Sequence, residues 1–173
     1  MKQAYEPVQR GRAAWLPGIV LVFAGAFSMP GHGADRVKAQ VLFVCEHGNV
    51  KSLMAASYFN RMAAARNLPF RAVSRGSAPD STSVPPGIVA GLHEDGFEVA
   101  AFHPAAVAMS DLAASAHLVL IGTELPANVR GHEISLEHWM DVPPASVNFD
   151  AARKSLQAHV RLLLDQLERA RDW

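Results

Sequence analysis

The sequence predicts an α/β fold of three layers, in which helices cover both faces of a four-stranded parallel sheet. Segments rich in β-branched and aromatic residues alternate along the chain with segments of helical periodicity. The strand segments are apolar on both faces, as at 41–44 (VLFV), which is typical of buried parallel strands. The chain has 173 residues and half of them are apolar, which is enough for one domain with its own core.

The first strand, at 41–44, runs directly into Cys45, the only cysteine of the chain. A short polar loop follows, and Lys51 and Ser52 then open a helix that we expect to continue to Arg66. Backbone N–H groups of such a loop and of a helix N-terminus form a concave site for oxyanions. The same positive field favours the thiolate form of a cysteine, which is then a nucleophile beside the bound anion. We therefore expect a phosphate loop after the first strand, although a lone cysteine ending a strand is ordinarily a core residue.

The remaining elements are expected in alternation. They are a strand at 70–74, a turn-rich loop at 75–83, a helix from Pro85 and Pro86 to about Asp95, a short helix at 111–115, strands at 117–122 and 133–139, and a last helix after Asn148. Ligands of parallel sheets bind beyond the carboxyl ends of the strands, which is where the sequence places Cys45.

The pattern of Cys45, five residues, a cation at 51 and then Ser52 resembles the phosphate loop of the low-molecular-weight protein tyrosine phosphatases and of the related arsenate reductases. The resemblance extends from about Val41 to the C-terminus. It implies that Cys45 is the nucleophile, that Lys51 holds the oxyanion and that the Ser52 hydroxyl stabilises the sulfur as a leaving group. The substrate-binding residues that it implies are Glu46, His47, Gly48, Asn49, Val50 and Ser52.

The family carries its general acid after the last strand, as an aspartate followed by proline in a mobile loop. Asp141 matches this position, although Val142 stands between it and Pro143. A carboxylic acid there protonates the leaving oxygen as the P–O bond breaks. The alternative is that Asp141 only starts a proline turn, where aspartate is common.

Several residues depart from the family pattern. Lys51 replaces an arginine, and lysine lacks the planar two-pronged contact that arginine makes to an oxyanion. Glu46 adds a negative charge beside the nucleophile. Pro143, Pro144 and Ala145 stand where phosphotyrosine-specific members have aromatic residues, which argues against selectivity for tyrosine.

Three functions follow from these residues. The first is a cysteine-dependent phosphatase that hydrolyses phosphate monoesters. The second is an arsenate reductase that uses an external thiol, because a single cysteine excludes recycling through further cysteines of the same chain. The third is a non-catalytic oxyanion-binding protein, which Lys51 and Glu46 suggest. The expected ligand is a phosphate or arsenate oxyanion, with a phosphoprotein as a candidate substrate.

Residues 1–34 predict a signal peptide or an N-terminal membrane segment, separate from a phosphatase-like domain at 38–173. A basic start is followed by an uncharged stretch at 13–31 and by small residues at 31–34. This is the layout of a secretory signal, so we expect a periplasmic or secreted protein. An uncleaved anchor is one alternative; an over-extended gene start, which would leave the protein cytoplasmic, is the other. We expect membrane contact only through this segment.

The composition argues against other function classes. With 16 basic and 16 acidic side chains, the chain lacks the basic field of a nucleic-acid-binding protein. One cysteine excludes an intramolecular disulfide. The histidines, His132 and His138 included, show no metal-ligand spacing, so we expect neither a metal nor a cofactor.

Overall fold

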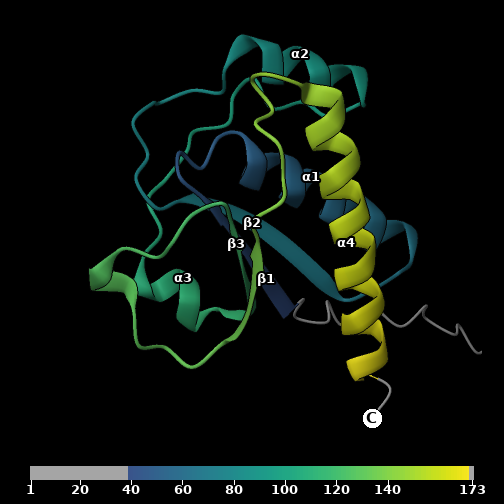
Figure 1. Cartoon of the computed structure of the whole chain (residues 1–173). Coiled ribbons are helices and arrows are strands. Elements are labelled where there is room, and N and C mark those ends of the chain that lie inside the picture. The colour runs from purple at the N-terminus through teal and green to yellow at the C-terminus, as the bar shows by residue number, and fades with distance from the viewer. Residues whose placement is uncertain (1–38, 172–173) are drawn as a thin grey trace, which may run out of the picture. The chain divides into compact units, whose positions relative to one another are not determined.

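The computed structural model describes residues 39–171, which form one parallel sheet with helices on both faces (Figure 1). Within this range the strands are β1 (Ala39–Cys45), β2 (Phe70–Gly76), β3 (Ser115–Ile121) and β4 (Ser135–Trp139). Their order in the sheet is β2-β1-β3-β4, and all pairs are parallel. The strand that ends at Cys45 is therefore a central strand.

The helices cover the two faces unequally. The helical segments are α1 (Lys51–Ala65), α2 (Pro86–Glu94), α3 (Met109–Ala113), α4 (Phe149–Arg171) and a short 3-10 turn, η1 (Ala127–Val129). The long helices α1 and α4 lie on one face, and the short α3 lies on the other (Figure 1). The predicted three-layer α/β fold is confirmed.

The central strand β1 serves two cores at once. Val41 and Phe43 pack on the side of α1 and α4, whereas Leu42 and Val44 pack on the side of α3. None of the four is more than 1% exposed. Burial of a large apolar side chain stabilises the fold by about 1.5–3 kcal/mol, so this strand is held firmly from both sides.

Strand β2 is longer than the sequence predicts. Arg75 and Gly76, which we expected in a loop because of the turn residues that follow them, continue the strand and pair with Val44 and Cys45. The pairing partner at the end of β1 therefore overrides the local composition. This places the backbone of Gly76 beside the loop that follows Cys45.

The short helix lies two residues earlier than predicted. It occupies Met109–Ala113 because the Asp111 carboxylate accepts a hydrogen bond from the backbone N–H of Ala108 at 2.9 Å, which caps the helix start. Ser115, which we expected at its end, begins β3 instead. Strand β4 begins at Ser135, two residues later than predicted.

The predicted export or membrane segment, residues 1–34, lies outside the described residues. Among residues 39–171, no helix is both long and apolar enough to cross a membrane.

Candidate active site

A cavity of about 200 Å³ opens beyond the carboxyl ends of β1 and β3. Three segments enclose it: the loop after β1, the end of β3 and the turn before α4. Its lining residues are Cys45, Glu46, His47, Val50, Lys51, Ile121, Gly122, Pro144, Ala145 and Ser146. The cavity thus lies at the sheet edge where the sequence predicts an oxyanion site.

The sulfur of Cys45 makes two polar contacts, one with its own loop and one with the first turn of α1. Cys45 lines the cavity although the residue is only 4% exposed. Its Sγ lies 3.0 Å from Ser52 Oγ, and the backbone N–H of Gly48 donates to it at 3.3 Å. The contact with Ser52 has the geometry that the family resemblance implies.

A second hydroxyl, to which the sequence pattern assigned no role, supports the first. Ser74 of β2 lies with its Oγ 2.9 Å from Ser52 Oγ and 2.8 Å from the carbonyl oxygen of Gly48. Both serines are buried, so these bonds are shielded from water. The alternation of β2 was the available signal, because it turns Ser74 to the same side as the buried Ala72.

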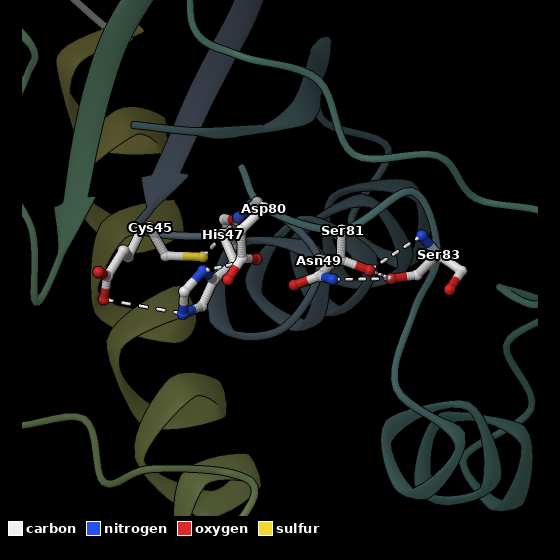
Figure 2. A network of polar contacts seen from close by, with 9 residues as sticks. Cys45, His47, Asn49, Asp80, Ser81 and Ser83 are labelled. Atoms are coloured by element: carbon white, nitrogen blue, oxygen red, sulfur yellow. Dashed lines mark hydrogen bonds and ion pairs between the residues drawn. The ribbon is translucent and has the colours of Figure 1, made fainter. Parts of the chain in front are cut away.

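The loop between Cys45 and Lys51 is held in shape by the segment after β2. Ser77 N–H donates to the carbonyl of Cys45 at 2.9 Å, and Ala78 N–H donates to that of Glu46 at 2.8 Å. The Asn49 amide donates to the carbonyl of Ser83 at 2.7 Å, as Figure 2 shows. These bonds hold the predicted binding loop from one side and leave its other side open to the cavity.

An imidazole flanked by two carboxylates stands at the edge of the cavity. His47 Nδ1 lies 3.0 Å from Asp80 Oδ1 (Figure 2). The other ring nitrogen, Nε2, lies 3.8 Å from Glu46 Oε2. Both carboxylate side chains are about two-thirds exposed, so solvent screens these pairs. The sequence analysis anticipated Glu46 and His47 here, but Asp80 is brought in by the fold.

Lys51 occupies the first turn of α1 and lines the cavity. Its Nζ lies 3.5 Å from the carbonyl oxygen of Val142, the residue after Asp141. A side-chain carbon added at Gly122 would lie only 3.0 Å from this Nζ, so the glycine leaves room for the ammonium group. The cation therefore stands between the phosphate-type loop and the turn that follows β4.

Asp141 is not among the residues that line the cavity. Its side chain is 71% exposed, and its Oδ1 lies 2.8 Å from His159 Nε2 on α4. The His159 ring stacks on Trp139, with ring centroids 4.8 Å apart and an angle of 18° between the planes. The structure thus brings Cys45 and Lys51 together at one cavity and leaves the Asp141 carboxylate bound to α4.

Metal-binding clusters are absent from the part of the chain that the structure describes. No group of three or more His, Cys, Asp or Glu side chains within residues 39–171 is placed to hold a metal ion.

Comparison with known proteins gives a clear result only at the level of structure. No protein-family model and no curated protein sequence matches the chain. Among solved structures, YfkJ from Bacillus subtilis has a TM-score of 0.66 at 20% identity, with 81% of this chain and 99% of that chain covered. A low-molecular-weight protein tyrosine phosphatase from T. tengcongensis has a TM-score of 0.57 at 19% identity, with 75% and 99% covered.

A thioredoxin-dependent arsenate reductase from Corynebacterium glutamicum is also similar. Its TM-score is 0.64 at 17% identity, with 79% of this chain covered. This chain spans only 65% of the length of that protein. The resemblance inferred from the loop after β1 is therefore matched by the arrangement of the whole sheet. Residues 39–171 have the fold shared by the low-molecular-weight protein tyrosine phosphatases and the arsenate reductases.

Proposed function

We propose that the protein is a cysteine-dependent phosphatase of the protein-tyrosine-phosphatase-like type, which hydrolyses phosphate monoesters. The observation that carries this proposal is the environment of the Cys45 sulfur. The backbone N–H of Gly48 donates to this sulfur and the Ser52 hydroxyl lies 3.0 Å from it, at a cavity that Lys51 also lines. A nucleophile, a stabilising hydroxyl and a cation thus meet where an oxyanion fits.

In the first step, the Cys45 thiolate attacks the phosphorus atom in line with the leaving oxygen. The S–P bond forms as the P–O bond breaks, and the leaving oxygen takes a proton from the Asp141 carboxylic acid. Lys51 and the backbone N–H groups of the loop stabilise the charge on the equatorial oxygens. The products of this step are a free alcohol or phenol and a phosphocysteine.

In the second step, a water molecule attacks the phosphorus atom of the phosphocysteine. The Asp141 carboxylate, now deprotonated, accepts a proton from that water. The S–P bond breaks, and the hydroxyl of Ser52 donates to the departing sulfur of Cys45, from which it lies 3.0 Å away. Phosphate leaves, and the thiolate is restored for the next cycle.

The role of Asp141 in these steps requires a movement. Its carboxylate is bound to His159 and lies apart from the cavity lining, so it must leave that bond to reach the leaving oxygen. The carbonyl of the next residue, Val142, already lies 3.5 Å from Lys51 Nζ. A change of the Asp141 side-chain direction, with a small shift of this turn, is the movement that we propose.

The alternative chemistry is arsenate reduction, because the same cavity accepts an oxyanion of arsenic. Cys45 then attacks the arsenic atom and water leaves. An external thiol attacks the Cys45 sulfur and forms a mixed disulfide as the S–As bond breaks. The electron pair of that bond reduces arsenic from the +5 to the +3 state, and arsenite leaves. A second external thiol restores Cys45. The structural similarity to an arsenate reductase supports this alternative.

A three-part assay on the full-length protein separates the candidate functions. Phosphate release from an aryl phosphate, thiol-dependent loss of arsenate, and phosphate binding by calorimetry are measured on the same preparation. We expect phosphate release that Cys45→Ser abolishes, with phosphate binding retained in that variant. Arsenate loss without phosphate release would establish the reductase, and binding without either reaction would establish the binding protein.

A further inference from the structure

A second cavity, of about 420 Å³, lies next to the candidate active site. It is bounded by the start of α2 and by the turn before α4. Its lining residues are Pro85, Gly87, Ile88, Ala145, Ser146, Val147 and Phe149. Ala145 and Ser146 also line the cavity that holds Cys45, so the two cavities share a wall.

The second cavity differs from the first in its chemistry. The first contains a thiol, a cation and an imidazole, whereas the second has no ionisable side chain among its lining residues. Ser146 provides its only side-chain polar atom, and that residue lies on the shared wall. A site of this composition favours apolar groups, because it offers no partner for a charge and releases water from apolar surface on binding.

One residue at this cavity is unusually exposed for its type. Val147 is 83% exposed, the highest value among the exposed large hydrophobic residues of the described range. Two other residues that line the cavity belong to the main core: Ile88 is buried, and Phe149 is partly buried against that core. An apolar ligand seated here would therefore cover Val147 and extend a packed surface that already exists.

We propose that this second cavity is a subsite for an apolar leaving group, and that the protein acts on phosphate monoesters whose alcohol or phenol carries an extended apolar part. The proposal rests on the proposed phosphatase function for the position of the phosphoryl group. With the oxyanion held by the loop after Cys45, the wall formed by Ala145 and Ser146 separates the leaving group from the second cavity. A ligand that continues past this shared wall enters the apolar cavity.

The experiment compares two substrates whose leaving phenols have nearly the same acidity: phenyl phosphate and 4-biphenylyl phosphate. The second adds one ring and changes the chemistry of the reacting bond little. We expect kcat/KM to be about tenfold or more higher for the biphenylyl ester, since burying one more ring favours its transition state. Equal values of kcat/KM for the two esters would overturn the proposal.

Gly87→Phe tests whether the second cavity causes the preference. Gly87 lines this cavity, and a side-chain carbon added there meets no atom within 4 Å, so the substitution places a ring at the cavity without a clash at its first carbon. The matched control is Ala90→Phe, at an exposed position of α2 that does not line the cavity. We expect Gly87→Phe to remove the biphenylyl preference while kcat/KM for phenyl phosphate stays within about twofold, and Ala90→Phe to keep it. A preference that survives Gly87→Phe would place the apolar subsite elsewhere.

A second variant guards against misfolding of the first. Val147→Asn removes apolar surface from an exposed position without adding bulk, so we expect little change in the stability of the fold. We expect it to reduce the biphenylyl preference several-fold. An unchanged ratio of the two kcat/KM values in Val147→Asn and in Gly87→Phe would contradict the subsite.

Binding of non-hydrolysable analogues separates this proposal from the proposed function. Phenylphosphonate and 4-biphenylylphosphonate are titrated into the native protein and the Gly87→Phe variant by calorimetry. Tighter binding of the biphenylyl compound that Gly87→Phe abolishes would establish the subsite even if the protein hydrolyses no ester. Hydrolysis of both esters, with equal affinity for both phosphonates, would support the phosphatase and overturn the subsite.

Discussion

Gly48 is the residue on which the shape of the binding loop depends most. Its φ is +78°, and a side-chain carbon there would lie 2.6 Å from the backbone nitrogen of Gly76. Its N–H also donates to the Cys45 sulfur. The loop can therefore approach β2 closely only because both residues are glycine.

Gly48→Ala should distort the loop, since strain and a backbone clash act together. We expect a stability loss of about 1–3 kcal/mol from the backbone conformation, with a further loss from the clash. Catalysis should fall more than it does in the matched control, Gly96→Ala. Gly96 has a φ of +80° but no atom within 4 Å of an added carbon, so that control isolates the strain. Urea unfolding and kcat/KM are measured for both, and equal losses in the two variants would refute the clash.

Lys51 is the residue at which the chain departs most sharply from the family pattern. Arginine would offer two parallel charge-assisted hydrogen bonds to the transferring group, each worth about 1.5–3 kcal/mol, whereas lysine offers a point charge. Lys51→Arg should therefore raise kcat/KM for a simple aryl phosphate about ten- to a hundredfold. The comparison is made at equal folded fraction, with phosphate affinity measured alongside. Tighter phosphate binding without faster turnover would show that the lysine does not limit catalysis.

At the scale of elements, the connection from β4 to α4 governs how the candidate acid reaches the cavity. Its first residues bring the Val142 carbonyl to Lys51, and its last residues, Ala145 and Ser146, form the cavity wall. Asp141 lies in the same segment, directly before Val142, and its carboxylate is bound to His159 of α4. One short segment therefore carries the proposed acid and part of the binding surface.

The proposed acid role of Asp141 makes a prediction about leaving groups. Asp141→Asn should lower kcat/KM, which reports the transfer of the phosphoryl group to Cys45, by about 10²–10⁴-fold for phenyl phosphate, because the phenoxide must be protonated as it leaves. The loss should be much smaller for 4-nitrophenyl phosphate, whose leaving group is a stable anion. Glu137→Gln, at a carboxylate of β4 that bonds Trp139 Nε1 rather than lining the cavity, is the control. Losses of the same size for both substrates would exclude Asp141 as the acid.

Elements with strong local signals could be predicted, and those decided by pairing could not. The run at 41–44 and the apolar stripe of α4 indicated a central strand and a packed helix, because their patterns match the environment that they enter. The extension of β2 through Gly76 and the capping of α3 by Asp111 depend on partners distant in the sequence or on one side-chain bond. A local hydrophobic pattern carries no information about a distant pairing strand, and it does not register a single side-chain bond such as that of Asp111.

The same limit applies to the site. The spacing of Cys45, Lys51 and Ser52 indicated one loop, since all three lie within a single strand-to-helix connection. Asp80 arrives from the segment after β2, so its position beside His47 follows from the fold and not from its neighbours in the chain. The bond between Asp141 and His159, 18 residues apart, was equally hidden from a pattern-based analysis.

At the scale of the whole molecule, His117 links stability to pH. It lies on β3 with only 7% of its surface exposed, and its Nε2 is 3.3 Å from Glu137 Oε1 without the geometry of a hydrogen bond. Burial lowers the pKa of His117 below its usual value near 6.5, and the opposing attraction of Glu137 does not offset this. The folded protein therefore binds a proton at this site less readily than the unfolded chain does.

The sign of the resulting pH dependence follows directly. The fold favours the neutral form of His117. The free energy of unfolding is therefore not reduced by this residue above about pH 6.5, and it decreases as the pH falls below that value. The urea concentration at half-unfolding of the native protein should decrease when the pH is lowered from 7.5 to 5.5, and it should decrease less in His117→Leu. A fall of the same size in the variant would show that other groups cause the acid sensitivity.

The central claim is that Cys45 forms a covalent bond to phosphorus during turnover, and a rapid acid quench tests it most directly. The full-length protein is mixed with an aryl phosphate, quenched and digested, and the peptide containing Cys45 is weighed by mass spectrometry. Our account predicts a phosphoryl group on Cys45 and none on that peptide in Cys45→Ala, which should release no phosphate. Phosphate release that continues in Cys45→Ala would contradict the account.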